Sequence, residues 1–263
     1  MKIKNLYSCL LHFCLPLFLF TISLAAIAQT ADDIVSKHIE ALGGKDKLNS
    51  LQSVYLEGVS VMANGTEVDS KIWRVKDKLS RQEISFGMGN VVIIVTPKQG
   101  WRSNTRNGGN FEAIPEEQLK AMQMQLDLAG PFVDYASKGY TLELLGNDTL
   151  NASPCYKIRL TTQSGTSVIY FIDAKTYYIV RETRKGSGMF GGGGHRGNGG
   201  GNGAGGTGNA DQTYNIDFSD YQKTPDGYIL PYSMVIGGGS KTSFEKIEVN
   251  KPVDDAKLSK PGN

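Results

Sequence analysis

The chain has 263 residues, and its 28 basic and 26 acidic residues give a formal net charge of only +2. Removal of a predicted leader, described next, takes away two lysines and leaves equal numbers of basic and acidic residues. Recognition of nucleic acid needs a clustered basic surface, so this composition excludes nucleic acid as a partner. The remaining length suits one large β domain, which we expect to occupy residues 29–263.

Residues 1–28 are typical of a cleavable signal peptide. A stub with two lysines precedes a long apolar run that ends at Leu24, and Ala26-Ile27-Ala28 then supplies the small-residue pattern that signal peptidase recognises. The alternative is an uncleaved membrane anchor, because the apolar run is almost long enough to span a bilayer. The A-x-A pattern favours cleavage after Ala28, so we expect export and free diffusion in a periplasm.

The three cysteines predict no disulfide in the mature protein. Cys9 and Cys14 leave with the leader, and neither stands directly after the apolar run, where lipidation would require it. Only Cys155 remains, so no internal pair can form. It begins a predicted strand and has no nearby His in the sequence, which favours a buried, inert thiol over a nucleophile.

The mature chain begins with an amphipathic helix. Thr30 and Asp33 form a capping-box pattern, and Gly43-Gly44 provides a C-terminal stop. Apolar positions at helical spacing form one stripe, which consists of Ile34, Val35, His38, Ile39 and Leu42. We interpret His38 as a packed core residue and not as a ligand or base, because a lone His on such a stripe is usually structural.

From Leu51 the sequence pattern changes to that of strands rich in β-branched and aromatic residues. The first four predicted strands are Val54–Met62, Val68–Lys76, Leu79–Phe86 and Val91–Thr96. Asn64-Gly65 favours a type I′ turn and predicts a hairpin between the first two strands. Val91–Val95 does not alternate, so both faces of the sheet should be covered there.

A second helical region follows the pair Gly100-Trp101 and a polar loop that ends at Asn110. Pro115-Glu116-Glu117 opens it and Ala129-Gly130-Pro131 closes it, with a short continuation that ends at Lys138-Gly139. Its apolar residues are mostly flexible Leu and Met, which suits a surface that repacks around variable apolar shapes. An ordinary helix that fills the core of the sheet explains the same pattern, and the sequence does not separate the two interpretations.

Strands then continue to the end of the chain. We predict them at Tyr140–Leu145, Cys155–Thr162, Ser167–Asp173, Tyr177–Lys185, Tyr214–Tyr221, Tyr228–Ile236 and Thr242–Val249. About eleven strands joined by tight turns indicate an antiparallel meander that curls to limit its exposed edges. The predicted fold is therefore α+β, an incomplete antiparallel β-barrel, or half-barrel, with helices packed in its concave mouth.

Residues 186–208 are mostly glycine and can bury almost no apolar surface. We predict a disordered insertion within a hairpin, which a fold tolerates because loop-closure entropy grows slowly with length. Its first six residues match G-x-G-x-x-G, but the glycines that follow cannot form the helix that a dinucleotide site needs. We assign no function to this segment.

No pattern typical of a catalytic or metal site is present. The sequence contains no G-x-S-x-G, H-E-x-x-H or C-x-x-C, and only His38 and His195 remain after cleavage. We therefore expect no catalytic residues, no metal and no cofactor, and a protein that is not an enzyme. Asp148-Thr149-Leu150, in a predicted polar loop, has the form of an O-glycosylation signal of some Gram-negative bacteria, and the sequence leaves open whether it is modified.

Short fragments along most of the mature chain resemble the periplasmic outer-membrane lipoprotein carrier (LolA-like) family, in particular its distant, Bacteroidetes-type members. These fragments are Leu42-Gly43-Gly44, Leu51–Val54, Gly100-Trp101, Lys138–Tyr140, Leu144–Gly146, Tyr156–Leu160, Tyr170–Thr176, Asp220-Tyr221 and Gly227–Pro231. The glycine-rich insertion departs from the family pattern, and no motif places the polar residues with which the family grips a lipoprotein head region.

This resemblance implies an apolar inner face, lidded by helices, that takes up the acyl chains of lipids or lipoproteins. By residue type and position, the candidate cavity residues are Trp101, Leu119, Met122, Leu126, Phe132, Tyr135 and Phe171. We expect a monomeric periplasmic lipid or lipoprotein carrier that serves sorting to the outer membrane, with envelope membrane proteins as further candidate partners. The alternatives are an envelope sensor or interaction module on the same fold and, ranked last, a hydrolase.

Overall fold

The computed structural model describes residues 29–87, 89–105, 108–185, 213–237 and 239–254. The predicted signal peptide at 1–28 and the predicted glycine-rich insertion at 186–208 lie outside these residues. The chain divides into residues 1–30 and a compact unit, Ala31–Asn263, which contains the sheet and its helices. Within the described residues, no helix combines the length and the apolar character needed to cross a bilayer.

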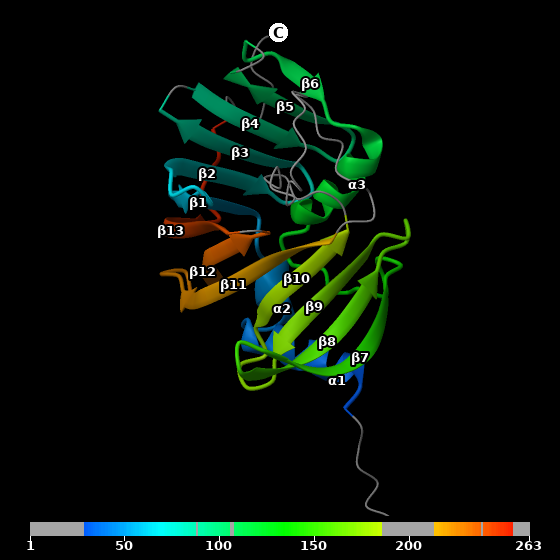
Figure 1. The fold of residues 1–263 in the computed structure, drawn as a ribbon. Helices are drawn as coiled ribbons and strands as arrows, with labels where there is room; N and C mark the ends of the chain where they lie inside the picture. The colour runs from blue at the N-terminus through cyan, green and yellow to red at the C-terminus, as the bar shows by residue number, and fades with distance from the viewer. Residues whose placement is uncertain (1–28, 88, 106–107, 186–212, 238, 255–263) are drawn as a thin grey trace, which may run out of the picture. The chain divides into compact units, whose positions relative to one another are not determined.

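The described residues contain one antiparallel sheet of thirteen strands (Figure 1). Its strands are β1 Ser53–Val61, β2 Glu67–Val75, β3 Leu79–Phe86, β4 Gly89–Val95, β5 Gly100–Asn104, β6 Phe111–Ala113, β7 Thr141–Leu150, β8 Ser153–Thr161, β9 Ser167–Asp173, β10 Ile179–Lys185, β11 Thr213–Lys223, β12 Ile229–Ile236 and β13 Ser240–Val249. The spatial order runs from β6 through β1, then β13, to β7. The edge strands β6 and β7 do not pair, so the sheet is open, and the predicted α+β half-barrel is confirmed.

Four short helices with defined bounds accompany the sheet in the described part of the chain. They are α1 Ala31–Ala41, α2 Lys45–Asn49, α3 Glu116–Gln123 and the 3-10 turn η2 Met124–Leu126. The predicted N-terminal helix is confirmed, and it ends before Gly43 and Gly44, which both have positive φ. The second helical region is shorter than predicted, because the backbone becomes extended at Asp127 and Gly130 has a φ of 93°.

Two extra strands explain why the count exceeds the eleven that we expected. Gly100–Asn104 forms β5, although the sequence predicted a polar loop from Arg102 to Asn110, and Phe111–Ala113, for which the sequence predicted no element, forms β6. Their polar residues obscure the strand pattern, whereas the backbone bonds depend little on side-chain type: Trp101 pairs with Ile94 on one side and with Ala113 on the other. In β4, Ile93, Ile94 and Val95 are all buried, which confirms that both faces are covered there.

Turn chemistry was only partly predictable. The hairpin at Asn64-Gly65 is confirmed, but its turn is not type I′: Gly65 alone has positive φ, and it closes a three-residue loop between Met62 and Thr66. Positive φ at both Asn151 and Ala152 instead places a type I′ turn between β7 and β8. This tight turn extends β7 to Leu150, so Asp148-Thr149-Leu150 lies in a strand and not in a loop as expected.

The inner face of the sheet, defined as the face on which α1 and α3 pack, has two unlike halves. Over β7–β10, Ile34 and Val35 of α1 and the loop residue Phe132 pack on buried strand side chains to form a dense core. Over β1, β2, β12 and β13 a second cluster, formed mainly by strand residues, meets only Leu128 from the covering segment. The first half is filled, and the second is partly open.

Candidate functional site

An apolar cavity of about 360 Å³ occupies the open half of the inner face. Its floor consists of strand residues, and its cover is the segment from Ala121 to Pro131. The apolar lining includes Leu51, Val54, Leu56, Ile72, Met122, Met124, Leu128, Pro131, Ile216, Phe218, Leu230, Met234, Ile236 and Phe244. Its volume falls within the range of pockets that hold small ligands.

Strand periodicity produces this lining. Successive side chains of a strand point to opposite faces, so every second residue of each strand reaches the cavity. On β11 these are Tyr214, Ile216 and Phe218, and on β12 they include Met234 and Ile236. Because β1, β2, β11, β12 and β13 each contribute at least one apolar side chain, the lining combines strands that are far apart in the sequence.

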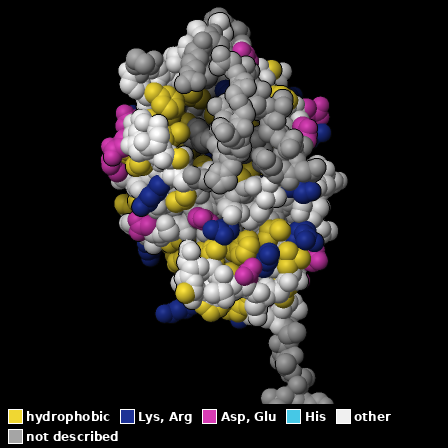
Figure 2. Space-filling model, in the orientation of Figure 1, with side chains coloured by type: hydrophobic (Ala, Val, Ile, Leu, Met, Phe, Trp, Pro, Cys, Tyr) yellow, Lys and Arg dark blue, Asp and Glu magenta, His cyan; other side chains and the backbone are white. Residues whose placement is uncertain are grey.

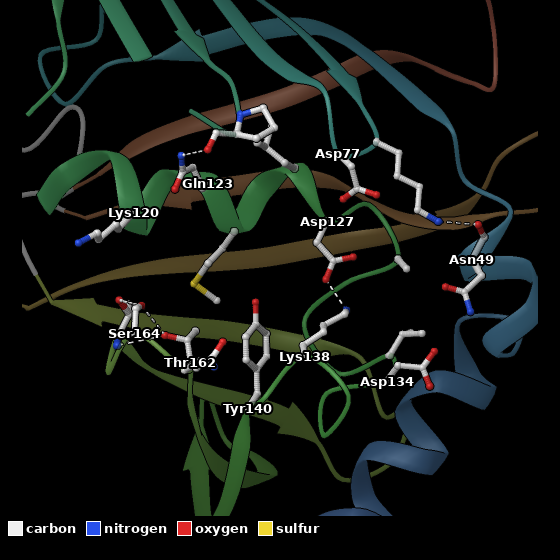
Figure 3. Close-up of a pocket in the computed structure, with 18 residues that line it drawn as sticks. Asn49, Asp77, Lys120, Gln123, Asp127, Asp134, Lys138, Tyr140, Thr162 and Ser164 are labelled. Atoms are coloured by element: carbon white, nitrogen blue, oxygen red, sulfur yellow. Dashed lines mark hydrogen bonds and ion pairs between the residues drawn. The ribbon is translucent and has the colours of Figure 1, made fainter. Parts of the chain in front are cut away.

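The segment Met124–Pro131 separates the apolar cavity from a second, polar cavity of about 650 Å³. Met124 and Asp127 line both, while Leu126 and Ala129 face only the polar cavity. Figure 3 shows the polar side, where Lys138 reaches Asp127 and Lys120, Tyr140 and Ser164 lie around the opening. The segment is therefore a thin partition, and we refer to Met124–Pro131 by that name below.

Lys138 holds the partition in place. Its ammonium group pairs with Asp127 and donates a second hydrogen bond to the carbonyl oxygen of Gly130 at 3.0 Å. A further tie comes from α3, because Gln123 donates to the carbonyl of Pro97 at 2.9 Å (Figure 3). Few other polar contacts of the described residues fix this segment to the sheet.

Besides Asp127 of the partition, three charged residues of the strands interrupt the apolar lining: Arg74 on β2 and Glu182 and Arg184 on β10. Arg184 donates two hydrogen bonds to Glu182, at 2.9 and 2.6 Å. Burial lowers the pKa of Arg74, the positive charge of Arg184 lowers it further, and Glu182 opposes both. Four strands separate β2 from β10 in the sheet, so these charges can interact only because the sheet curves back on itself.

Two tyrosines lie beside this charged cluster. Tyr170 stands opposite Glu182, and Tyr214 stands opposite Arg184 in the strand register. Burial raises the pKa of both phenols; the positive charge of Arg184 opposes this rise, and the negative charge of Glu182 adds to it. Both phenols are therefore neutral at physiological pH and present hydroxyl groups at this end of the cavity.

The structure disperses the seven predicted cavity residues. Met122 lines the apolar cavity and Leu126 lines the polar one. The other five line neither. Leu119 packs with Ile114 against β4, and Phe132 is buried in the filled half, with its ring 4.8 Å from that of Tyr170.

The remaining three predicted residues lie elsewhere. The hydroxyl group of Tyr135 donates a hydrogen bond to the carboxylate of Asp32 at the start of α1. Trp101 stands opposite Ile94 in the register, on the face turned away from α3, so it cannot reach the cavity. Phe171 alternates with the inward residues Tyr170 and Ile172 and carries Lys157 over its ring, 5.3 Å from the centroid. Hydrophobic and charged side chains are mixed in this way over β8–β10 (Figure 2).

His38 and Cys155, which we interpreted from the sequence as structural residues, are both buried. His38 is buried, and its Nδ1 atom lies 2.7 Å from the carbonyl oxygen of Tyr177, which confirms its interpretation as a core residue. Cys155 is buried, and burial raises the pKa of its thiol, which disfavours the reactive thiolate. Among the described residues, no three His, Cys, Asp or Glu side chains gather as a metal site would require.

Sequence reasoning missed the charged cluster entirely. One signal was available: Val68, Ser70 and Ile72 are the inward residues of β2, and Arg74 follows at the same spacing. A charged residue in the inward register of a strand is unusual and marks a position worth attention. The proximity of Arg74 to Glu182 and Arg184 had no local signal.

Comparisons with known proteins support the fold. No protein-family model matches the chain, and no curated protein matches it. Among solved structures, the chain is similar to an outer membrane lipoprotein-sorting protein domain from Vibrio parahaemolyticus, with a TM-score of 0.51 and 8% identity over 86% of this chain and 95% of that one. The chain is also similar to a LolA superfamily protein from Nitrosomonas europaea, with a TM-score of 0.51 and 12% identity over 88% of this chain and 98% of that one.

A DUF1329 family protein from Desulfovibrio piger is similar to the same extent, with a TM-score of 0.52, 14% identity, and 86% and 97% of the two chains covered. All three similarities extend over nearly the whole of the solved chains, so they concern the complete half-barrel and not one motif within it. At these identities they establish a shared fold. The resemblance to LolA-like proteins is thus confirmed at the level of the fold.

Proposed function

We propose that this protein binds acyl chains of lipids or lipoproteins in the apolar cavity and carries them through the periplasm toward the outer membrane. The observation that supports this proposal is a continuous apolar lining on the inner face, beneath a thin partition. The proposed activity is binding and transfer without catalysis. A similar solved fold from Vibrio parahaemolyticus that is described as a lipoprotein-sorting domain adds support.

The physics of lipid transfer gives such a cavity a purpose. Burial of one long acyl chain is worth about 10 kcal/mol, at ~0.8 kcal/mol per methylene group, so a lipid does not cross an aqueous compartment unaided. A carrier needs an apolar container that opens and closes. The partition Met124–Pro131 is suited to this, because Met124 is flexible and only a few polar contacts hold the segment.

The place of action follows from the predicted leader. We propose that cleavage after Ala28 releases the protein as a soluble monomer in the periplasm. Its partners there would be the acyl chains themselves and the envelope membrane proteins that deliver or receive them.

Binding is tested with the mature chain, residues 29–263, purified from a membrane-containing host and analysed by native mass spectrometry and by uptake of a fluorescent fatty acid. Ile216→Trp fills the cavity and should reduce uptake at least tenfold. Ile169→Trp is the matched control, because Ile169 alternates with the inward residues Val168 and Tyr170 and lies on the other face. If the purified protein contains no lipid and does not take up the fluorescent fatty acid, the proposal is wrong.

Transfer is tested separately, because binding alone fits an envelope sensor as well as a carrier. Donor vesicles with a self-quenched fluorescent lipid are mixed with acceptor vesicles and the mature protein. We expect transfer that increases with protein concentration and is lost in Ile216→Trp. Binding without transfer would replace the carrier function with that of a sensor.

A further inference from the structure

Arg74 is an uncompensated charge inside an apolar cavity. Its Nε atom is shielded from solvent and has no hydrogen-bond partner, and no ion pair or hydrogen bond of the described residues involves its side chain. Burial of a charge without a partner is strongly unfavourable. An arginine stays protonated nonetheless, because its pKa is far above physiological pH.

The neighbouring charges do not neutralise Arg74. Glu182 is engaged by two hydrogen bonds from Arg184, on the same strand. Asp127, the other carboxylate that lines the cavity, pairs with Lys138. The cluster of Arg74, Glu182 and Arg184 therefore carries one excess positive charge in a space lined mainly by apolar side chains.

We propose that Arg74 binds the anionic head group of an acyl ligand, a carboxylate or a phosphate, while the acyl chain lies on the apolar lining. This inference rests on the proposed lipid-binding function and assigns the chemical class of the ligand. A guanidinium group matches the planar carboxylate and the phosphate by two parallel hydrogen bonds, which are stronger where water is excluded. Tyr170 and Tyr214 stand at the same cluster and offer hydroxyl donors.

Apolar surface begins directly beside the charge. Ile72 precedes Arg74 at the next inward position of β2, and Val54, the cross-strand partner of Arg74, also lines the cavity. Leu56 stands opposite Ile72 and Phe244 lies further across the same face. One molecule with a charged head and an apolar tail can therefore satisfy both parts of the site at once.

The test compares an acid with its neutral ester. Delipidated mature protein is titrated at pH 8 with cis-parinaric acid and with its methyl ester, which share the acyl chain and its fluorescence. We expect the wild type to bind the acid at least tenfold more tightly than the ester. Arg74→Met removes the charge but keeps much of the side-chain volume, and it should reduce this ratio below threefold while the ester affinity stays unchanged.

Two further variants sharpen the result. Arg74→Lys keeps the charge and should retain part of the preference for the acid. Arg159→Met removes an exposed arginine that pairs with Glu143, and it should behave as the wild type. Competition by palmitate, hexadecyl phosphate and hexadecanol then distinguishes a carboxylate head group from a phosphate. If either anion displaces the probe better than the alcohol does, the proposal is supported, and the stronger competitor identifies the preferred head group.

Two results would overturn the assignment of Arg74. The wild type could bind the acid and the ester equally, or the preference for the acid could persist in Arg74→Met. Tight ester binding in either case would leave the proposed lipid-binding function intact. If neither acid nor ester binds the wild type, the lipid-binding function itself fails, and the assignment fails with it.

Discussion

The two halves of the inner face are built from the same kind of antiparallel strand, yet one is filled and the other is hollow. Over β7–β10, α1 and Phe132 close the space, and Ile158, Leu160 and Ile172 are fully buried. Over β1, β2 and β11–β13, the cavity residues Ile216, Phe218 and Met234 remain partly exposed. The difference lies in the covering segment and not in the strands.

This contrast separates stability from proposed function. A helix that buries Ile34, Val35 and His38 helps to fill one half, and close packing there leaves little room for a ligand. The end of the short helix α3 and the partition, which begins with a 3-10 turn, cover the other half and leave a cavity. We expect substitutions in the filled half to reduce stability, and substitutions in the hollow half to alter binding.

The largest effect should come from a matched pair of Phe→Ala substitutions. Phe132 is buried among Tyr170, His38 and α1, so Phe132→Ala should lower the free energy of unfolding by about 3–5 kcal/mol. Phe218 borders the existing cavity, and Phe218→Ala should cost only about 1–2 kcal/mol, since less area is buried there. Urea denaturation of the delipidated proteins measures both; equal losses would contradict the division into two halves.

A second pair of variants compares a buried ion pair with an exposed one. Glu182→Gln leaves Arg184 and Arg74 facing each other without a counter-charge, and we expect a loss of about 3 kcal/mol in the free energy of unfolding. Glu143→Gln breaks the exposed pair with Arg159 and should cost less than about 1 kcal/mol. If Glu182→Gln is as mild as its control, the cluster is better hydrated than its burial indicates.

The half-barrel was predictable because its signals are local. Alternating strands, the Asn64-Gly65 dipeptide and the apolar stripe of the first helix each act within about ten residues. Strands β5 and β6, at one end of the sheet, were missed because they are short and their polar residues obscure the alternation. The turn at Asn151-Ala152 was missed because alanine seldom adopts positive φ, and here the paired strands impose it.

The site was far less predictable, because it depends on which face each residue occupies. Trp101 and Phe171 were chosen by residue type, and strand alternation turns both away from the cavity. In Tyr170-Phe171-Ile172 all three residues are buried, so the sequence could not separate the faces. Arg74 meets Glu182 only through the curvature of the whole sheet, which no local pattern contains.

Loosening the partition should have a smaller effect, confined to the hollow half. Lys138→Met removes the pair with Asp127 and the hydrogen bond to Gly130. We expect amide hydrogen exchange in residues 124–131 to accelerate about five- to tenfold, which corresponds to about 1 kcal/mol of local stability. Lys120→Met, which removes an exposed pair with Glu116 on α3, is the control and should leave exchange in the partition unchanged. Unchanged protection in Lys138→Met would show that the remaining contacts, such as the hydrogen bond from the Asp77 amide to the carbonyl of Leu126, hold the segment without Lys138.

The smallest expected effect is on the pH dependence of stability, in which His38 of the filled half should differ from Arg74 of the hollow half. Burial lowers the pKa of His38 below its ordinary value of 6.5, and the hydrogen bond with Tyr177 opposes this only in part. Below pH 6.5 the unfolded chain therefore takes up a proton that folded His38 does not, and stability falls as the pH is lowered.

His38→Gln cannot titrate but can still donate to the carbonyl of Tyr177. Between pH 6.5 and 5.5 the wild type should lose about 1 kcal/mol more free energy of unfolding than His38→Gln, as measured by urea denaturation. Arg74→Met should follow the wild type across this range, because Arg74 stays charged throughout. The filled half would then account for the acid sensitivity linked to His38, while the charge of Arg74 in the hollow half stays constant and available to an anionic ligand. If the free energy of unfolding falls equally with pH in the wild type and in His38→Gln, this explanation is wrong.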